Sequence, residues 1–95
     1  MAVINTIYEA IGDRRVLAFS YKGKDRTVEP YIVGYDDKSK LVLSAVQLSG
    51  GSGVGFRSFD VDALSSVTKT DRRFHGAHPD YNPHDPYFAR ILRRV

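Results

Sequence analysis

The 95-residue sequence contains no cysteine, no tryptophan and only one methionine. Without cysteine, the chain can form no disulfide framework, no thiolate metal site and no cysteine nucleophile. It also lacks the run of roughly 18 to 20 apolar residues that spans a bilayer, and its first residues lack the basic-then-apolar pattern of a secretory signal. We therefore expect a soluble, cytoplasmic protein with no membrane partner.

A strong excess of charge of one sign is also missing, since 14 Lys and Arg oppose 11 Asp and Glu. The first 68 residues hold eight basic and eight acidic side chains, whereas residues 69–95 hold six basic and three acidic ones. The net charge of +3 therefore comes wholly from the C-terminal part of the chain. Cations near phosphates gain Coulomb energy and release counterions, so this asymmetry favours an anionic partner such as nucleic acid.

Patterns that carry catalysis are absent as well. No Gly-x-Ser-x-Gly elbow occurs, and the glycines of residues 50–55 lack the Lys-Ser or Lys-Thr of a phosphate loop, so we expect a hairpin loop there. Zinc-binding chemistry occurs in the tail, but its spacing matches no known motif. The residues concerned are His75, His78, Asp80, His84 and Asp85. We expect neither an enzyme nor a resident cofactor or metal ion.

Hydrophobic periodicity predicts a mainly β domain that begins with a helix. Ile4, Ile7, Tyr8 and Ile11 recur at helical spacing, which predicts an amphipathic helix ending near Gly12. Five segments rich in β-branched and aromatic residues predict five short strands. These strands are expected at residues 16–21, 26–35, 41–46, 55–61 and 65–70.

Turn and breaker residues place bends between and within these strands. Pro30 removes a ladder donor and predicts an edge or a bend, and Gly34 predicts a second kink. Asp60 is expected to cap a single helical turn over residues 60–64. Five short strands with one bent pair predict a small SH3-like or Sm-like barrel.

The tail, residues 75–95, carries a different pattern. Three prolines and the absence of a periodic apolar pattern predict extended chain from His75 to Pro86, crossing the barrel surface. Pro86 suits the first turn of a final helix with a recurring apolar face. That face comprises Tyr87, Phe88, Ile91, Leu92 and Val95. We therefore divide the chain into a barrel domain, residues 1–74, and a tail with a C-terminal helix packed on or beside it.

Two short patterns, in this order and spacing, resemble the WYL domain family. An Arg-x-Val-x-Pro pattern spans Arg26 to Pro30, and an Arg-x-Phe pattern spans Arg57 to Phe59 before an aspartate and a short apolar turn. The resemblance runs over about residues 4–74, although Leu41-Val42-Leu43 stands where the family has Trp-Tyr-Leu. It implies a bacterial Sm-like barrel of the kind attached to transcription regulators, which senses nucleic acid or nucleotide ligands.

Two arginines are the first candidates for contact with such a ligand. Alternation along the strand puts Arg57 beside Phe59, so that a guanidinium grips a phosphate while the ring stacks a base. Arg26 is the second candidate by the same argument. The alternative for each arginine is an ion pair with a neighbouring carboxylate. Those carboxylates are Asp60 and Asp62 for Arg57, and Asp25 and Glu29 for Arg26.

Further candidates lie on the predicted strands. Ser44 and Gln47 could offer hydrogen bonds to a ligand in a shared pocket, or belong to a solvated strand face. Tyr21, Tyr31 and Tyr35 could stack on bases, or pack in the core. We expect a ligand-sensing regulatory module that binds single-stranded nucleic acid or a nucleotide. The alternative is an interaction domain that self-associates through barrel edges or docks a protein partner through the final helix.

Overall fold

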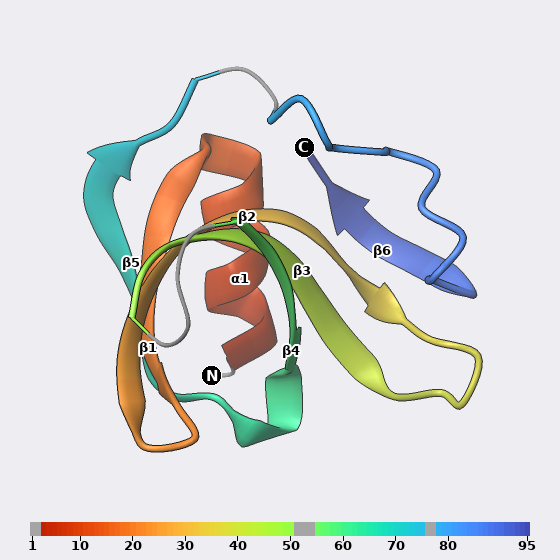
Figure 1. The fold of residues 1–95 in the computed structure, drawn as a ribbon, viewed down its shortest axis with the longest axis horizontal. Coiled ribbons are helices and arrows are strands. Elements are labelled where there is room, and N and C mark those ends of the chain that lie inside the picture. Colours follow the sequence, from red (N-terminus) through yellow and green to blue (C-terminus); the bar gives the residue numbers. More distant parts are fainter. Residues whose placement is uncertain (1–2, 51–54, 76–77) are drawn as a thin grey trace.

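The computed structural model describes residues 3–50, 55–75 and 78–95. The predicted N-terminal helix, five strands and helical turn are confirmed, and a sixth strand follows (Figure 1). The expected glycine-rich hairpin loop lies largely outside the described residues. The elements are α1 (Val3–Asp13), β1 (Arg15–Tyr21), β2 (Lys24–Tyr35), β3 (Leu41–Ser49), β4 (Gly55–Asp60), the 3-10 helix η1 (Val61–Ala63), β5 (Ser65–Arg73) and β6 (Arg90–Arg94).

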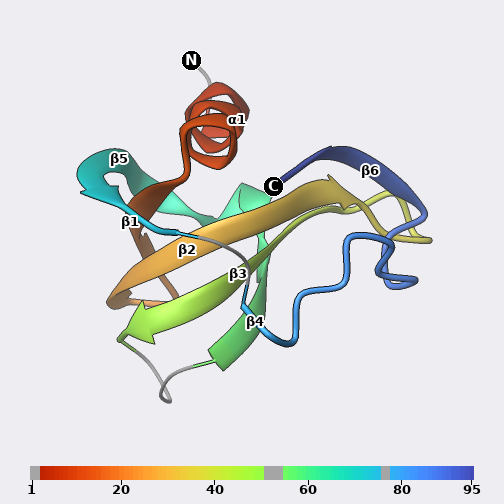
Figure 2. The ribbon, with the colours of Figure 1, turned by 90° about the horizontal axis from the view of Figure 1, so that it is seen from above.

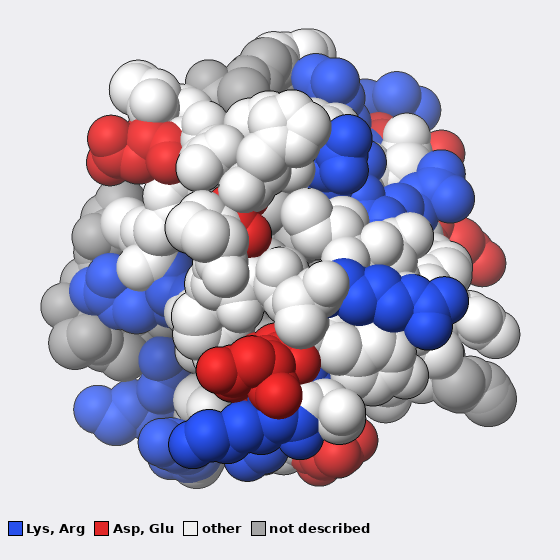
Figure 3. Space-filling model, turned by 90° about the vertical axis from the view of Figure 1, so that its right-hand side faces the viewer, with Lys and Arg blue, Asp and Glu red and all other residues white. Residues whose placement is uncertain are grey.

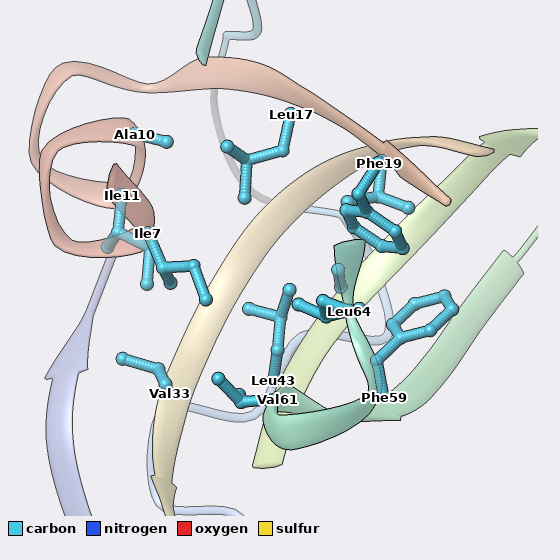
Figure 4. Packing of buried hydrophobic residues seen from close by; sticks show 12 residues of the cluster. Ile7, Ala10, Ile11, Leu17, Phe19, Val33, Leu43, Phe59, Val61 and Leu64 are labelled. Atoms are coloured by element: carbon cyan, nitrogen blue, oxygen red, sulfur yellow. The ribbon is translucent and has the colours of Figure 1, made fainter. Parts of the chain in front are cut away.

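The strands form one antiparallel sheet in the order β4-β3-β2-β1-β5, with β6 paired to β2. Within the described ranges, β4 and β5 pair with β3 and β1 but not with each other, so the sheet is open rather than the closed barrel expected. Between β4 and β5, side chains pack together where a closed barrel would have backbone hydrogen bonds. The rings of Phe19 and Phe59 meet edge to face across this opening, with Leu64 beside them (Figure 4).

Helix α1 covers one face of the sheet. Its residues Ile7 and Ile11 are buried, and they pack with Leu17, Val33 and Leu43 from the strands beneath (Figure 4). Each such side chain contributes about 1.5–3 kcal/mol through burial. The helical spacing of the N-terminal segment is therefore explained by this first hydrophobic cluster.

A bulge interrupts β2 next to Pro30. The register with β3 pairs Pro30 with Ala45 and Ile32 with Ser44, which leaves Tyr31 as the extra residue. Tyr31 and Ile32 consequently both belong to a second hydrophobic cluster, although they are consecutive. The bend predicted at Pro30 is confirmed, but β2 is a central strand and not an edge.

Strand β2 pairs with different strands before and after this bulge. Residues 24–28 pair with β1, whereas residues 32–35 pair with β6. The hydrogen bond from the Val95 amide to the Tyr31 carbonyl, 2.9 Å long, closes the end of this second pairing. Strand β6 therefore forms hydrogen bonds with backbone groups of β2 that do not pair with β1.

The predicted C-terminal helix is wrong, because residues 90–94 form β6. A helix of so few residues is marginal by itself, whereas residues 32–35 of β2 have backbone groups to which an added strand can bond. As a result, the apolar residues with helical spacing do not share one face. Phe88 and Ile91 join the second cluster, and Leu92 packs against the first.

The rest of the tail lies on the face of the sheet opposite α1 (Figure 2). Tyr31 fixes it there, because its hydroxyl accepts a 2.8 Å hydrogen bond from the His78 amide and its ring lies 4.9 Å from that of Tyr81. Burial raises the pKa of both tyrosines, so their hydroxyls stay protonated. The predicted extended run is instead a series of turns, closed by hydrogen bonds such as that from the Tyr81 amide to the His78 carbonyl.

Replacing Gly34 with alanine should detach β6. A Cβ at this position would overlap the Arg90 carbonyl oxygen, so Gly34→Ala is expected to cost about 2 kcal/mol and to speed amide exchange in β6. Gly23→Ala is the control. Its φ of +77° is strained, but no atom lies within 4 Å, so it should cost about 1 kcal/mol and leave β6 protected. Equal exchange in the two variants would contradict this role of Gly34.

Candidate functional site

Arg26 lies near the start of β2, over two aromatic rings. Its guanidinium carbon is 5.2 Å from the centre of the Tyr21 ring and 5.8 Å from that of Phe59. The two rings stand edge to face, 5.1 Å apart. Because the faces of aromatic rings carry negative potential, they hold the cation without neutralising it. We call this group, with Gln47 described next, the Arg26 cluster.

Gln47 fixes the orientation of the guanidinium. Arg26 Nη1 donates a 3.0 Å hydrogen bond to Gln47 Oε1, and Nη2 donates a 3.4 Å bond to the Tyr21 carbonyl. Gln47 is fully buried, and its Nε2 donates to the Gly50 carbonyl at 2.6 Å. Gly50 has a φ of +92°, and a Cβ there would overlap the Asp25 carbonyl oxygen, so a glycine is required at this close approach.

The charge of Arg26 is not compensated within the described ranges. No carboxylate forms an ion pair with it there, so the alternative pairing with Asp25 or Glu29 is not observed. Its Nε is buried and has no hydrogen-bond partner among the same residues. A partly buried cation without a counter-ion is unfavourable. The Arg26 cluster is therefore electrostatically suited to an anion.

Four predicted contact residues thus meet in one place: Tyr21, Arg26, Gln47 and Phe59. Their exposure differs in a way that the sequence did not indicate. Phe59 exposes only 1% of its surface, so its ring supports Arg26 and is not open to a base. Tyr21 is half-buried, and its ring is the accessible one.

Arg57 and Ser44 lie elsewhere. Arg57 Nη1 donates a 2.9 Å hydrogen bond to the Phe56 carbonyl, and its predicted alternative partner Asp60 pairs instead with Lys40 at 3.2 Å. Both Arg57 and Ser44 line a pocket beneath the tail. The shared pocket expected for Ser44 and Gln47 is wrong, because residues three apart on a strand point to opposite faces.

Two hollows flank the Arg26 cluster. One, of about 270 Å³, includes Arg26 with Asp25 and Thr27. The other, of about 340 Å³, includes Tyr21 and Phe59 and adds three residues that the sequence reasoning missed. These are Lys22, Lys40 and Tyr87. No sequence pattern relates them, since two hairpin turns and the tail bring them together only in the fold.

These added residues carry positive charge and an accessible ring. Lys22 Nζ lies 5.5 Å from the centre of the Tyr21 ring. A hydrogen bond from Lys40 to Asp60, together with the charge of that carboxylate, raises the pKa of Lys40. Tyr87 is the exposed large hydrophobic residue of the described chain, at 49%.

Positive and negative side chains are mixed on the surface of the domain. On the side shown in Figure 3, acidic groups are interspersed among the Lys and Arg side chains. The residues described include no group of three or more His, Cys, Asp or Glu that could hold a metal ion. Among those residues, no helix is long and apolar enough to cross a membrane.

Together, the N-terminal helix, the open antiparallel sheet and the Arg26 cluster define a small β domain with a cation that forms no ion pair in the described residues. The model of the WYL domain family matches residues 2–69, and the chain therefore belongs to this family. The WYL domain is in general a ligand-sensing regulatory domain. The matched segment ends within β5, so the tail and β6 lie outside it. No curated protein and no solved structure matches the chain.

Removing the amide of Gln47 should destabilise the domain. Gln47→Leu leaves Arg26 and the Gly50 carbonyl without their buried partner, which is expected to cost about 1–3 kcal/mol in the free energy of unfolding, measured in urea. Lys24→Ala, at an exposed position of β2 whose side chain makes no hydrogen bond or ion pair with the described residues, should change it by less than about 0.5 kcal/mol. A Gln47→Leu protein as stable as the wild type would show that this hydrogen-bond network contributes nothing.

Proposed function

We propose that this protein senses single-stranded nucleic acid or a nucleotide, by binding a phosphate group at Arg26. One observation supports this above the others: a guanidinium that is held by two rings and a buried glutamine, yet forms no ion pair with a carboxylate in the described residues. Charge-assisted bonds from a guanidinium to phosphate are strong and directional. Following the family resemblance, we also propose that the sensing regulates transcription in the bacterial cytoplasm.

The neighbouring hollow supports the same ligand class. It combines the half-buried ring of Tyr21, the exposed ring of Tyr87 and the cation of Lys22, while Lys40 is paired there with Asp60. A base stacked on an aromatic ring contributes about 1–3 kcal/mol, whatever its identity. A phosphate at Arg26 and a base over one of these tyrosines would therefore bind nucleotides with little sequence preference.

Fluorescence anisotropy with short labelled single-stranded DNA and RNA tests this proposal. Wild-type protein should bind saturably, with an affinity that falls as salt rises. Arg26→Gln should weaken binding at least about tenfold, or ~1.4 kcal/mol. Arg72→Gln is the control, because Arg72 is an exposed arginine of β5 outside both hollows. An equal loss in the two variants would reduce the effect to net charge and contradict a specific site.

A second variant keeps Arg26 but neutralises its charge. Gln47→Glu places a carboxylate where the amide oxygen now accepts from Arg26, so it should abolish oligonucleotide binding while Arg26 remains. Circular dichroism and urea denaturation establish that the variant is folded. Undiminished binding by folded Gln47→Glu would show that the uncompensated charge is not what binds the ligand.

The open sheet favours one alternative function, self-association or the docking of a partner strand. In the described chain, β4 and β5 each pair on one side only, and unpaired strand edges are templates for added strands. Docking through a C-terminal helix is no longer an option, because that segment forms β6. Light scattering after size exclusion would remove self-association from this alternative if the protein stayed monomeric at every concentration tested.

A further inference from the structure

A separate pocket of about 270 Å³ lies between the sheet and the tail, on the face opposite α1. Its floor is a row of three residues on neighbouring strands, because Ile32 of β2 pairs with Ser44 of β3, which pairs with Ser58 of β4. Phe56 and Tyr81 supply rings to its lining. Most of one wall comes from residues 80–85, outside the segment that matches the family.

The tail that closes this pocket is fixed in position. The His78 ring stands edge to face with Phe56 at 5.2 Å, and the Tyr81 hydroxyl donates a 2.9 Å hydrogen bond to the Val95 carbonyl. Both contacts add to the hydrogen bond between the His78 amide and Tyr31. The pocket therefore has a defined shape rather than being a gap beneath a loose chain end.

Ser44 points to an occupant. It lines the pocket and is only 8% exposed, but its hydroxyl makes no hydrogen bond to any described residue. The oxygen is not fully enclosed by protein, so it is accessible from the pocket. The neighbouring Ser58 presents a second hydroxyl in the same row. Something that enters the pocket can complete the hydrogen bonding of both.

The charges of the pocket select a cation. Asp80 and Asp85 line it together with a single cation, Arg57, which already donates to a carbonyl. In the described chain, Asp80 has only a 3.9 Å contact with His78, and Asp85 has no ion pair while accepting from the Tyr87 amide. Two carboxylates against one guanidinium give the lining a net negative charge within a protein of net charge +3.

We propose that this pocket binds a small hydroxylated amine of about the size of a hexosamine. The ammonium group lies between Asp80 and Asp85, and the hydroxyl groups meet Ser44 and Ser58. The rings of the lining pack against the apolar face of the ligand, as in other small-molecule sites. This site is on the other face of the sheet from the Arg26 cluster, and its ligand has the opposite charge, so the inference stands apart from the proposed function.

Titration of ¹⁵N-labelled protein with glucosamine tests the proposal by NMR. Saturable shifts are expected at Ser44, Ser58 and the tail amides, while Gly50 beside the Arg26 cluster stays unmoved. Glucose has the same size and hydroxyl groups but no ammonium, and it should bind at least about tenfold more weakly. Absence of saturable glucosamine binding, or equal binding of the two sugars, would overturn the proposal.

Two variants localise the binding. Asp85→Asn keeps an oxygen that can accept from the Tyr87 amide but removes the charge, so it should weaken glucosamine binding about tenfold. Asp71→Asn, at an exposed position of β5 outside the pocket, should leave the affinity unchanged. An equal loss in both variants would assign the effect to overall charge and overturn the site. Arg26→Gln should bind glucosamine like the wild type, which keeps this test separate from that of nucleic-acid binding.

Discussion

The bulge at Tyr31 is the constraint on which both faces of the domain depend. It allows two consecutive residues, Tyr31 and Ile32, to face the second cluster. Tyr31 can therefore anchor the tail while the other side chains of β2 keep their faces. Before the bulge β2 pairs with β1, and after it with β6. Strand β2 therefore contacts both the hairpin that carries Arg26 and the tail that closes the pocket containing Ser44.

In the Arg26 cluster, a buried neutral side chain orients a cation without neutralising it. An amide oxygen from Gln47 orients the guanidinium, and two rings confine it, but neither removes the positive charge. A carboxylate in the same place would give a structural ion pair instead. The use of a neutral partner leaves the cation available, which is what a domain that senses an anion requires.

Much of this arrangement could be predicted from the sequence, because local patterns decide it. The spacing of Ile7 and Ile11 fixes the buried side of α1, and Asp60 caps η1 by accepting from the Asp62 amide. Strand alternation likewise predicted β4. These features depend on neighbours a few residues away, which are visible in the sequence.

The errors arose where distant segments meet. The apolar spacing after Pro86 suits a helix. This segment forms β6 instead, because β2 has an edge with which it can pair and Gly34 lets the two backbones approach closely. Likewise, nothing in the sequence links Gln47 to Arg26, since the register of β2 with β3 brings them together. Sequence patterns therefore predicted the local elements better than they predicted which distant side chains lie together.

The most direct measurement of the central claim is the NMR signal of the Arg26 Nε–Hε group during titration with adenosine monophosphate. If the uncompensated guanidinium is the anion site, this signal should shift saturably, with the same midpoint as the backbone amides around it. Binding of the nucleotide that shifts other residues and leaves the Arg26 signal unchanged would contradict the account, because the phosphate would then be bound elsewhere.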